Sequence, residues 1–343
     1  MVGKVQNQTE KLLPEHHPQT DLFVCDVTDA VIKDDIASME HPFYSLSKKP
    51  DLNVRRYENG DKWLEITPSV KGLATIYDKD ILIYCISQII AKIGKEESTQ
   101  RTMNINAKEL LVFINRKVGG RQYELLLESL ERLKGTNITT NILVDDIAYD
   151  DTRGFGLIDD FNIRRSKNTG RIIGITITLS EWVFRSIAKR QVLTLHRDYF
   201  RLRKPLERRV YEIARKHCGK QDEWTISIGK LKNKCGSKGK QKEFTRMLRE
   251  LVEGNHLPDY KVELDGSNVL FKNRESWWEN ESGTQFPTLD PETYHDARTV
   301  APGLDVHYLE QEWLRMWCET GKPEMKSPDR AFIGFCKKRY ERG

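Results

Sequence analysis

The clearest pattern of apolar and polar positions lies between residues 201 and 273. Four apolar residues recur there at intervals of three and four: Phe244, Met247, Leu248 and Leu251. This period predicts a helix with one buried stripe. A helix, a short strand and a second helix precede it, and two strands joined at Asp265-Gly266 follow it. That order of elements is typical of a winged helix.

An earlier stretch has the same plan. Asn106 is a good N-cap for a helix over residues 107–115, and a helix over 121–134 follows Gly119-Gly120. The side chains expected in the core from this second helix are Tyr123, Leu126, Leu127 and Leu130. Strands are expected at 137–144, 155–164 and 171–179, with 145–153 as a polar wing tip.

The two stretches align at a constant offset of 121 residues. The matched pairs are Ile105 with Ile226, Asn106 with Ser227, Leu110 with Leu231, Tyr123 with Phe244, Leu126 with Met247, Leu127 with Leu248 and Leu130 with Leu251. Generic helix periodicity alone would give some of these matches. Agreement of core, capping and strand positions at one offset predicts tandem related domains.

The other segments complete the predicted organisation. Residues 1–20 are polar and are expected to form a flexible arm, and residues 21–180 hold the first winged-helix domain. Residues 181–275 hold the second, 276–302 form a proline-containing linker, and 303–343 form a small helical module. Within the first domain, Asn59-Gly60 predicts a hairpin, and a helix with a broad apolar face begins at Asp78. The predicted fold class is α+β: tandem winged-helix domains, a linker and a small all-helical C-terminal unit.

The composition of the chain indicates its class of protein and its cellular compartment. The chain has 343 residues, 38% hydrophobic and 31% charged, as in a soluble globular protein. Its most apolar run, residues 81–90, is too short to span a bilayer, and the N-terminus lacks the apolar segment of an export signal. Six cysteines are scattered without a Cys-x-x-Cys pair, which indicates reduced thiols in a cytoplasmic protein without a membrane partner. No cofactor is expected, and the spacing of His217, Cys218 and Cys235 fits no common zinc site.

Positive charge is concentrated in the second domain. Residues 181–259 contain twenty Lys and Arg against ten Asp and Glu, whereas the whole chain carries a net charge of only +5. The remainder of the chain is therefore net acidic. Such asymmetry favours a local polyanion as the partner.

The helix that carries Phe244 has a cationic outward face. That face holds Lys242, Thr245, Arg246 and Arg249, and the glycine-rich turn before it adds Lys238 and Lys240. Apolar residues behind and cations in front suit insertion into the major groove of duplex DNA, where phosphates give affinity and base edges give specificity. The alternative is a solvated basic face, which is common on soluble helices.

The corresponding helix of the first domain has a mixed outward face: Arg121, Glu124, Leu125, Glu128 and Arg132. Its glutamates would repel phosphates. The main sequence recognition is therefore assigned to the second domain. The first is expected to contact DNA through Arg116, Lys117 and Arg121, or to pack against another subunit through an exposed Leu125.

A connector between the domains is rich in arginine. Its cations are Arg201, Arg203, Lys204, Arg208 and Arg209, which are expected to follow the DNA backbone between the two domains. Alternatively, several of them pair with Asp198, Glu207 and Glu212. Residues 196–216 hold eight cations against three acids, so pairing cannot neutralise them all.

The C-terminal module is rich in aromatic residues. These are expected to form a small core, and the alternative is a platform for single-stranded DNA or a helicase. The residues for this alternative are Trp313, Trp317, Lys337, Lys338 and Arg339.

No catalytic site is predicted. The chain has no G-x-x-x-x-G-K-[ST] phosphate loop, because Gly236-Ser237-Lys238-Gly239-Lys240 has the wrong spacing. Its histidines do not form the pair around one apolar residue that DNA-nicking initiators need, and its carboxylate clusters lie on predicted turns. The protein is not expected to be an enzyme.

Several runs of residues carry a family resemblance: KDDIASMEHPFYSLSKKPDLNVRRYE, ITPSVKGLATIYDKDILIYC, GFGLIDDF, LSEWVF, VLTLHRDYFRLRKPLERRVYEIARKHCG and AFIGFCKKR. Over residues 21–275 the chain resembles the replication initiator protein A family of bacterial plasmids, and the tail does so more loosely. The resemblance implies tandem winged helices that bind repeated sequences (iterons) at a plasmid origin, help to open adjacent AT-rich DNA and recruit host replication proteins. It implies no catalytic residues, and it supports the basic connector together with Lys242, Arg246 and Arg249 as DNA contacts.

The predicted function is therefore a cytoplasmic plasmid replication initiator. Its expected partners are double-stranded origin DNA, single-stranded DNA and a host helicase or loader, with a homodimer or a monomer-dimer equilibrium. Two alternatives stay open: a transcriptional repressor that binds a promoter palindrome, and a partition or scaffold protein. An initiator is expected to occupy several direct repeats, and a repressor a single palindrome.

Overall fold

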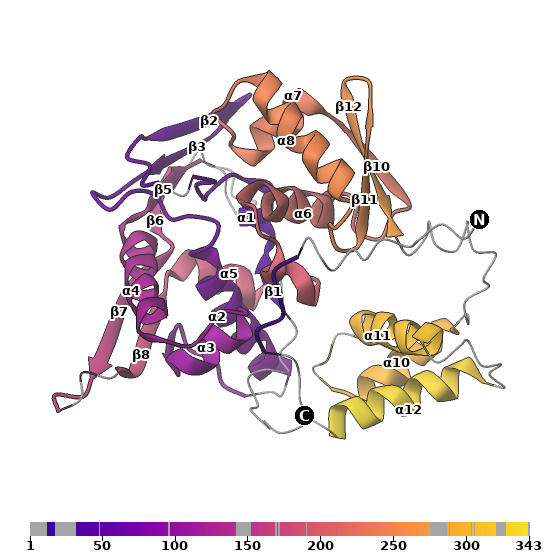
Figure 1. Ribbon diagram of the computed structural model, residues 1–343. Coiled ribbons are helices and arrows are strands. Elements are labelled where there is room, and N and C mark those ends of the chain that lie inside the picture. The colour runs from indigo at the N-terminus through magenta and orange to yellow at the C-terminus, as the bar shows by residue number, and fades with distance from the viewer. Residues whose placement is uncertain are drawn as a thin grey trace.

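The structure is a computed structural model that describes residues 12–17, 32–47, 49–94, 97–141, 152–168, 170, 172–189, 191–274, 287, 289–302, 304, 306–319 and 327–341 (Figure 1). In these ranges, helices alternate with small antiparallel sheets, so the protein has a mixed α and β fold. No helix among the described residues is both long and apolar enough to cross a bilayer.

The chain begins with a short strand, a helix and a hairpin. The elements are β1 (Lys33–Asp35), α1 (Ile36–Glu40), β2 (Arg55–Asn59), β3 (Lys62–Thr67) and α2 (Lys79–Gly94). Gly60, between β2 and β3, has a φ of +62°, which glycine adopts without the clash of a Cβ atom. The predicted Asn59-Gly60 hairpin is therefore confirmed.

Two units then repeat one order of elements. The first unit consists of β4 (Thr102–Ile105), α3 (Ala107–Phe113), α4 (Gly120–Gly135), β7 (Ile158–Arg165) and β8 (Ile172–Leu179). The second consists of β10 (Glu223–Ser227), α7 (Ile228–Cys235), α8 (Gln241–Gly254), β11 (Tyr260–Asp265) and β12 (Asn268–Asn273). Their sheets have the equivalent orders β4-β8-β7 and β10-β12-β11. The predicted caps are also present, because the side chains of Asn106 and Ser227 accept from backbone N–H groups of α3 and α7.

The constant offset of 121 residues fails in the last helix of each unit. The buried leucines of α4 are Leu126, Leu130 and Leu133, and the buried apolar residues of α8 are Phe244, Leu248 and Leu251, which makes the spacing 118. Tyr123 and Leu127, which were expected in the core, are half-buried, and so is Leu125, which was expected to be exposed. A periodic pattern fixes the period of a helix but not its rotation toward the core.

The strand expected at 137–144 is not part of the first wing. β5 (Asn137–Thr140) and β6 (Arg153–Gly156) extend the β2–β3 hairpin into a sheet of order β2-β3-β5-β6. The expected wing tip at 145–153 lies outside the described residues as far as 151. The wing hairpin consists of β7 and β8.

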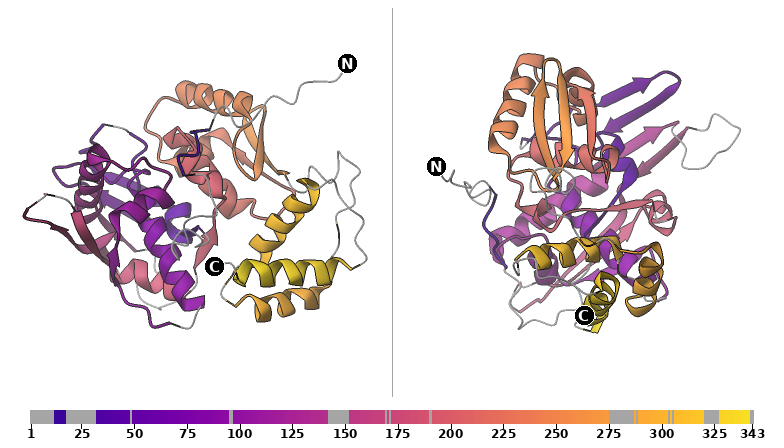
Figure 2. Two further views of the ribbon diagram at one scale, coloured as in Figure 1. Left: turned by 60° about the horizontal axis from the view of Figure 1, so that its bottom comes forward. Right: turned by 90° about the vertical axis from the view of Figure 1, so that its right-hand side faces the viewer.

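A connector leads from the first unit to the second. It contains α5 (Glu181–Ala188), β9 (Val192–Thr194), the 3-10 helix η2 (Arg197–Arg201) and α6 (Pro205–His217). β9 pairs with β1, and α6 packs against both α1 and α7 (Figures 1 and 2). All residues of α6 from Leu206 to Ala214 are buried, so this helix is an internal support rather than a surface element.

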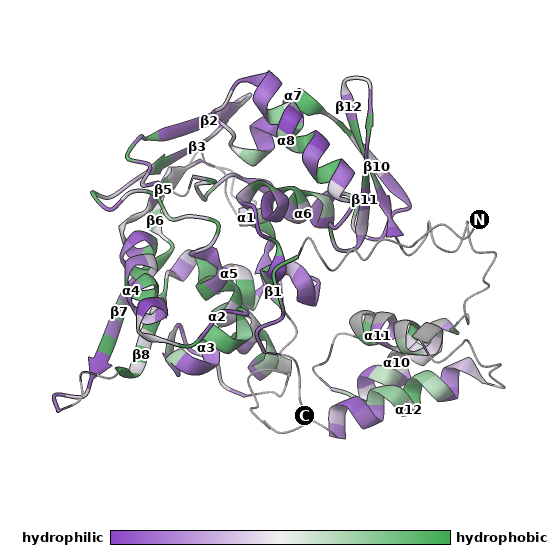
Figure 3. Ribbon diagram, in the orientation of Figure 1, coloured by the Kyte–Doolittle hydropathy of each residue, from purple (hydrophilic) through white to green (hydrophobic). Residues whose placement is uncertain are grey.

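The described residues contain two clusters of buried apolar side chains. The larger extends from Leu12 to Phe271 and includes both units together with hydrophobic residues of α2 and α6 (Figure 3). The smaller lies within α10 (Pro291–Val300), α11 (Val306–Glu319), α12 (Pro328–Glu341) and the segments beside them. The prediction of a linker over 276–302 is wrong for α10, because Ala297 and Ala301 are completely buried in this cluster.

The N-terminal segment differs from the flexible arm that was predicted. Among residues 12–17, Leu12 is only 7% exposed and belongs to the larger core. The backbone N–H of Leu13 donates to the carbonyl of Arg201 at 2.9 Å, and the N–H of His16 donates to Asn115 Oδ1 at 2.7 Å. This short segment therefore joins the first unit to the connector.

Candidate DNA interface

The α8 helix has one buried and one cationic face. Phe244, Leu248 and Leu251 are buried, while Lys242, Arg246 and Arg249 are exposed. Thr245 is half-buried and donates its hydroxyl to the carbonyl of Gln241 at 3.0 Å. The predicted arrangement of this helix is therefore present: an apolar face fixes it to the core and its cations face solvent.

The cations of α8 are held only loosely. Arg246 pairs with Glu250, and Lys204 pairs with the same carboxylate at 3.0 Å. The hydrogen bond from Lys204, followed by the charge of Lys204, holds the pKa of Glu250 below its ordinary value. Within the described part of the chain, Lys242 and Arg249 form no ion pair. Exposed pairs of this kind are weak, so all four cations can reach a phosphate without a large energetic cost.

The turn before α8 is anchored to the N-terminal half. Gly236 ends α7 with a φ of +68°, and a Cβ atom there would lie 2.7 Å from the Cβ of Pro42. Lys238 contacts Asp51 at 3.2 Å, whereas Lys240 is exposed and has no ion pair with any described residue. This anchorage fixes the direction in which α8 leaves the body of the protein.

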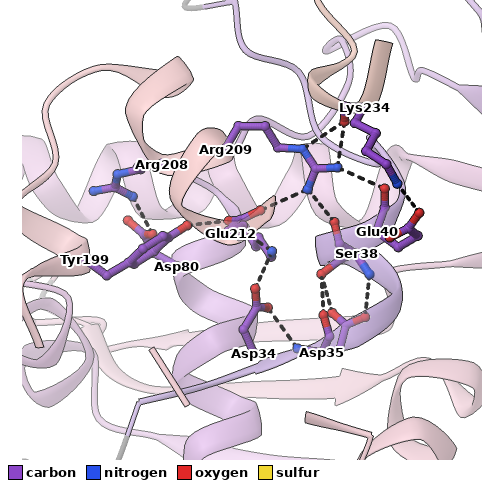
Figure 4. A network of polar contacts seen from close by, with 11 residues as sticks. Asp34, Asp35, Ser38, Glu40, Asp80, Tyr199, Arg208, Arg209, Glu212 and Lys234 are labelled. Carbon is purple, nitrogen blue, oxygen red and sulfur yellow. Dashed lines mark hydrogen bonds and ion pairs between the residues drawn. The ribbon is translucent and has the colours of Figure 1, made fainter. Parts of the chain in front are cut away.

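Arg208 does not lie on the surface. Its side chain is 4% exposed, and its Nη1 lies 2.6 Å from Asp80 Oδ1 (Figure 4). The same guanidinium donates to the carbonyls of Leu202 and Phe200, each at 3.1 Å. The prediction that Arg208 follows a DNA backbone is wrong for this fold, because the group is enclosed and already paired.

Arg209 requires the same correction. Its Nη1 donates to Glu212 Oε2 at 3.1 Å and to the carbonyl of Ser38 at 2.8 Å, and its Nη2 donates to the carbonyl of Lys234 at 2.8 Å. The guanidinium therefore joins α6 to α1 and α7 (Figure 4). The alternative interpretation, pairing with an acid of the connector, is confirmed for Arg209 by its contact with Glu212.

The remaining connector cations divide into two kinds. Arg201 pairs with Asp198 at 2.9 Å and donates to the carbonyl of Leu13 at 2.8 Å, so it supports the N-terminal segment. Arg203 is exposed, and its guanidinium donates a hydrogen bond of 3.2 Å to the carbonyl of Leu12. Only Arg203 and Lys204 remain exposed candidates for phosphate contact in this group.

The first unit presents fewer available cations near α4 than the sequence predicted. Arg116 is half-buried and pairs with Asp80 at 3.1 Å, so it belongs to the interior network. Lys117 is exposed, and Arg121 is 69% exposed beside Glu124 at 3.1 Å. The glutamate expected to repel phosphate thus lies directly beside a candidate cation.

The aromatic residues of the C-terminal module form a core. Trp313 is 2% exposed, and its ring centroid lies 5.5 Å from that of Phe332. A ring so enclosed cannot stack on a base, so the prediction that Trp313 forms a platform for single-stranded DNA is wrong for this fold. Trp317 is half-buried. Among the candidate cations, Lys337 and Lys338 are exposed, and Arg339 lies 3.3 Å from Glu312.

Sequence reasoning missed an interior ionic network around Lys79. This side chain is completely buried, and its Nζ lies 2.5 Å from Asp34 Oδ2 and 3.1 Å from Glu212 Oε1. Burial raises the pKa of Asp34 to about 8, although the charge of Lys79 opposes the rise. A charged Asp78-Lys79-Asp80 triplet at the start of an apolar helix was the available signal, because buried charges require partners.

Comparisons with known proteins identify sequences and structures that this chain resembles. A family model described as replication initiator protein A matches residues 33–262. A putative replication protein of Wigglesworthia glossinidia brevipalpis is 41% identical over 239 residues, which cover 69% of this chain and 86% of that protein. A crystal structure of RctB domains 2–3 has a TM-score of 0.48 and 10% identity, and covers 68% of this chain and 95% of the solved chain. A selenomethionine derivative of the same RctB domains has a TM-score of 0.47 and 15% identity, over 70% of this chain and 96% of the solved chain.

Proposed function

This chain belongs to the replication initiator protein A family, and on that premise we propose that it is a non-enzymatic initiator that binds repeated duplex sequences at a plasmid origin. Bound copies would promote opening of adjacent AT-rich DNA and recruit a host helicase or its loader. The protein would act in the cytoplasm on plasmid DNA, as a homodimer or in a monomer-dimer equilibrium. Each repeated unit would be a winged helix, with α8 as the recognition helix in the major groove.

The observation that carries this proposal is the exposed cationic face of α8. A helix enters the major groove only if one face is free, and phosphate contact requires cations that are not tied to stronger partners. Lys242, Arg246 and Arg249 meet both conditions, because all three are exposed and Phe244, Leu248 and Leu251 fix the opposite face. Lys204 and Arg203 would extend the same positive surface toward α6.

A nuclease footprint across the replicon that carries the gene tests the proposal. We expect several evenly spaced protected sites beside AT-rich sequence at near-physiological salt. Protection of a single symmetric site over the promoter, or no protection at all, would contradict an initiator.

Substitution of the cationic face tests the assignment of α8. A variant with Lys242→Ala, Arg246→Ala and Arg249→Ala should lose its preference for origin DNA over random DNA. The matched control removes three exposed cations from other elements, Arg56→Ala, Lys71→Ala and Arg185→Ala, and should retain that preference. If the α8 variant keeps its selectivity, the recognition helix is misplaced.

A further inference from the structure

The β7–β8 hairpin of the first unit carries a second concentration of unpaired positive charge. Arg164, Arg165 and Lys167 lie at its far end, and all three are exposed. Within the residues that the structure describes, none of them forms an ion pair, and the guanidinium of Arg165 donates a hydrogen bond of 3.5 Å to the carbonyl of Gly170. No acidic residue occurs between Phe161 and Gly174.

The acidic and basic residues of the hairpin lie at opposite ends of it. Its acidic residues, Asp159 and Asp160, lie at the base, where they pair with Arg101 at 2.7 Å and Lys134 at 3.6 Å. The cations begin at Arg164, five residues beyond Asp159 and four beyond Asp160, which corresponds to about 14–17 Å of extended strand. The acids at the base are thus neutralised locally, whereas the cations at the far end form no ion pair with any residue that the structure describes.

The charged end extends beyond the sheet. β4 pairs with β8 only over Ile175–Thr178, so the part of β8 nearer the tip pairs with β7 alone. This two-stranded part projects from the body of the protein, and it lies well away from α8 in both Figure 1 and Figure 2. Arginines on such a projecting ribbon contribute no ion pair to the fold, because they neutralise no acid among the residues that the structure describes.

The corresponding hairpin of the second unit has the opposite character. β11 and β12 are joined at Gly266 and Ser267, and the residues beside this turn are Asp265 and Asn268. No cation lies at that tip. The two units therefore differ in a complementary way: the second has a cationic helix and an acidic wing tip, and the first has a helix with glutamates and a cationic wing tip.

We propose that the tip of the β7–β8 hairpin binds the phosphate backbone of duplex DNA outside the segment contacted by α8. Arg164, Arg165 and Lys167 supply the contacts, which are independent of base sequence. The first unit thus adds affinity through its wing, and the second unit supplies selectivity through its helix. This inference rests on the proposed binding of duplex DNA. The experiment below distinguishes a failure of the hairpin proposal from a failure of the proposed function.

The test compares origin and random duplexes over a range of salt concentrations. The hairpin variant is Arg164→Ala, Arg165→Ala and Lys167→Ala, and its fold should be unchanged because these side chains are exposed and unpaired. We expect its affinity for both duplexes to fall by the same factor, its selectivity to persist, and the slope of log K against log salt to decrease by about 2 to 3. The matched control with Arg56, Lys71 and Arg185 replaced by alanine removes the same total charge and should keep the wild-type slope.

Two further measurements make the outcome decisive. A variant with Arg164→Lys and Arg165→Lys should keep the wild-type slope, because the slope depends on the number of phosphates that lysine or arginine neutralises. Phosphate ethylation should identify positions that block binding of the wild-type protein but not of the hairpin variant, outside the positions affected by the α8 variant. An unchanged slope and an identical ethylation pattern would overturn the proposal, whereas a wild-type protein that binds no duplex would overturn the proposed function itself.

Discussion

Replacing Arg208 with methionine separates a role in folding from a role in DNA binding. The methionine keeps most of the apolar volume but removes the guanidinium that faces Asp80 at 2.6 Å. Asp80 is completely buried, and among the described residues it would retain only the half-buried Arg116 as an ionic partner, at 3.1 Å. The carbonyls of Phe200 and Leu202 would each lose a donor, and the guanidinium would no longer lie 4.7 Å above the Tyr77 ring.

Removal of one partner from a buried ion pair typically costs about 3–5 kcal/mol, because the other charge stays buried without compensation. A typical domain is stable by about 5–15 kcal/mol, so this loss would be a large share of the total. We therefore expect Arg208→Met to lower the free energy of unfolding by about 3–5 kcal/mol in urea titrations followed by circular dichroism. Combining it with Asp80→Asn should cost less than the sum of the two single changes, because the uncompensated carboxylate is removed.

Arg249→Met is the matched control, since it makes the same chemical change on the exposed face of α8. It should change stability by no more than about 0.5 kcal/mol and reduce the salt dependence of DNA binding by about one phosphate contact. Arg208→Met, measured at a temperature where it remains folded, should keep the wild-type salt dependence. A cost below about 1 kcal/mol for Arg208→Met, or a reduced salt slope, would refute the assignment of Arg208 to the interior.

Two further predictions concern other parts of the molecule. Glu40 accepts hydrogen bonds from Lys216 and Lys234, and its Oε2 lies 2.8 Å from His217 Nε2. Burial alone would raise the pKa of Glu40, but these contacts outweigh burial and hold the pKa below its ordinary value. The carboxylate form stabilises the folded state above about pH 4.5, and this contribution is lost at lower pH. Glu40→Gln should therefore lower the free energy of unfolding by about 1–3 kcal/mol at pH 7 and by progressively less below pH 4.5. Urea titrations that show the same loss at pH 7 and below pH 4.5 would contradict this. Trp313→Ala should destabilise the C-terminal module by about 3–5 kcal/mol, because it removes a large side chain from the smaller core. Hydrogen exchange should then become faster in residues 289–341 but not in α6. A uniform increase in exchange along the whole chain would count against a separate core.

The sequence by itself determined the local elements. The period of Phe244, Leu248 and Leu251 predicted α8, Asn106 and Ser227 predicted the starts of α3 and α7, and all are present. These features depend on neighbours within a few residues, and such neighbours can be inferred from spacing and residue type alone. The separation of apolar and cationic faces on α8 follows from the same period.

Tertiary structure decided which cations are available. The local sequence does not distinguish the exposed Arg203 from the buried Arg208, which lie in the run Arg203-Lys204-Pro205-Leu206-Glu207-Arg208-Arg209. The acid that pairs with Arg208 is Asp80, which is far away in the chain. The same holds for Arg116, which Asp80 also neutralises. The cationic end of the β7–β8 hairpin became apparent only when the structure showed that its cations form no ion pair with any described residue. Charge counted along a sequence gives the total field of a region, whereas the pairing of each charge depends on contacts between distant segments, and only the folded chain establishes those contacts.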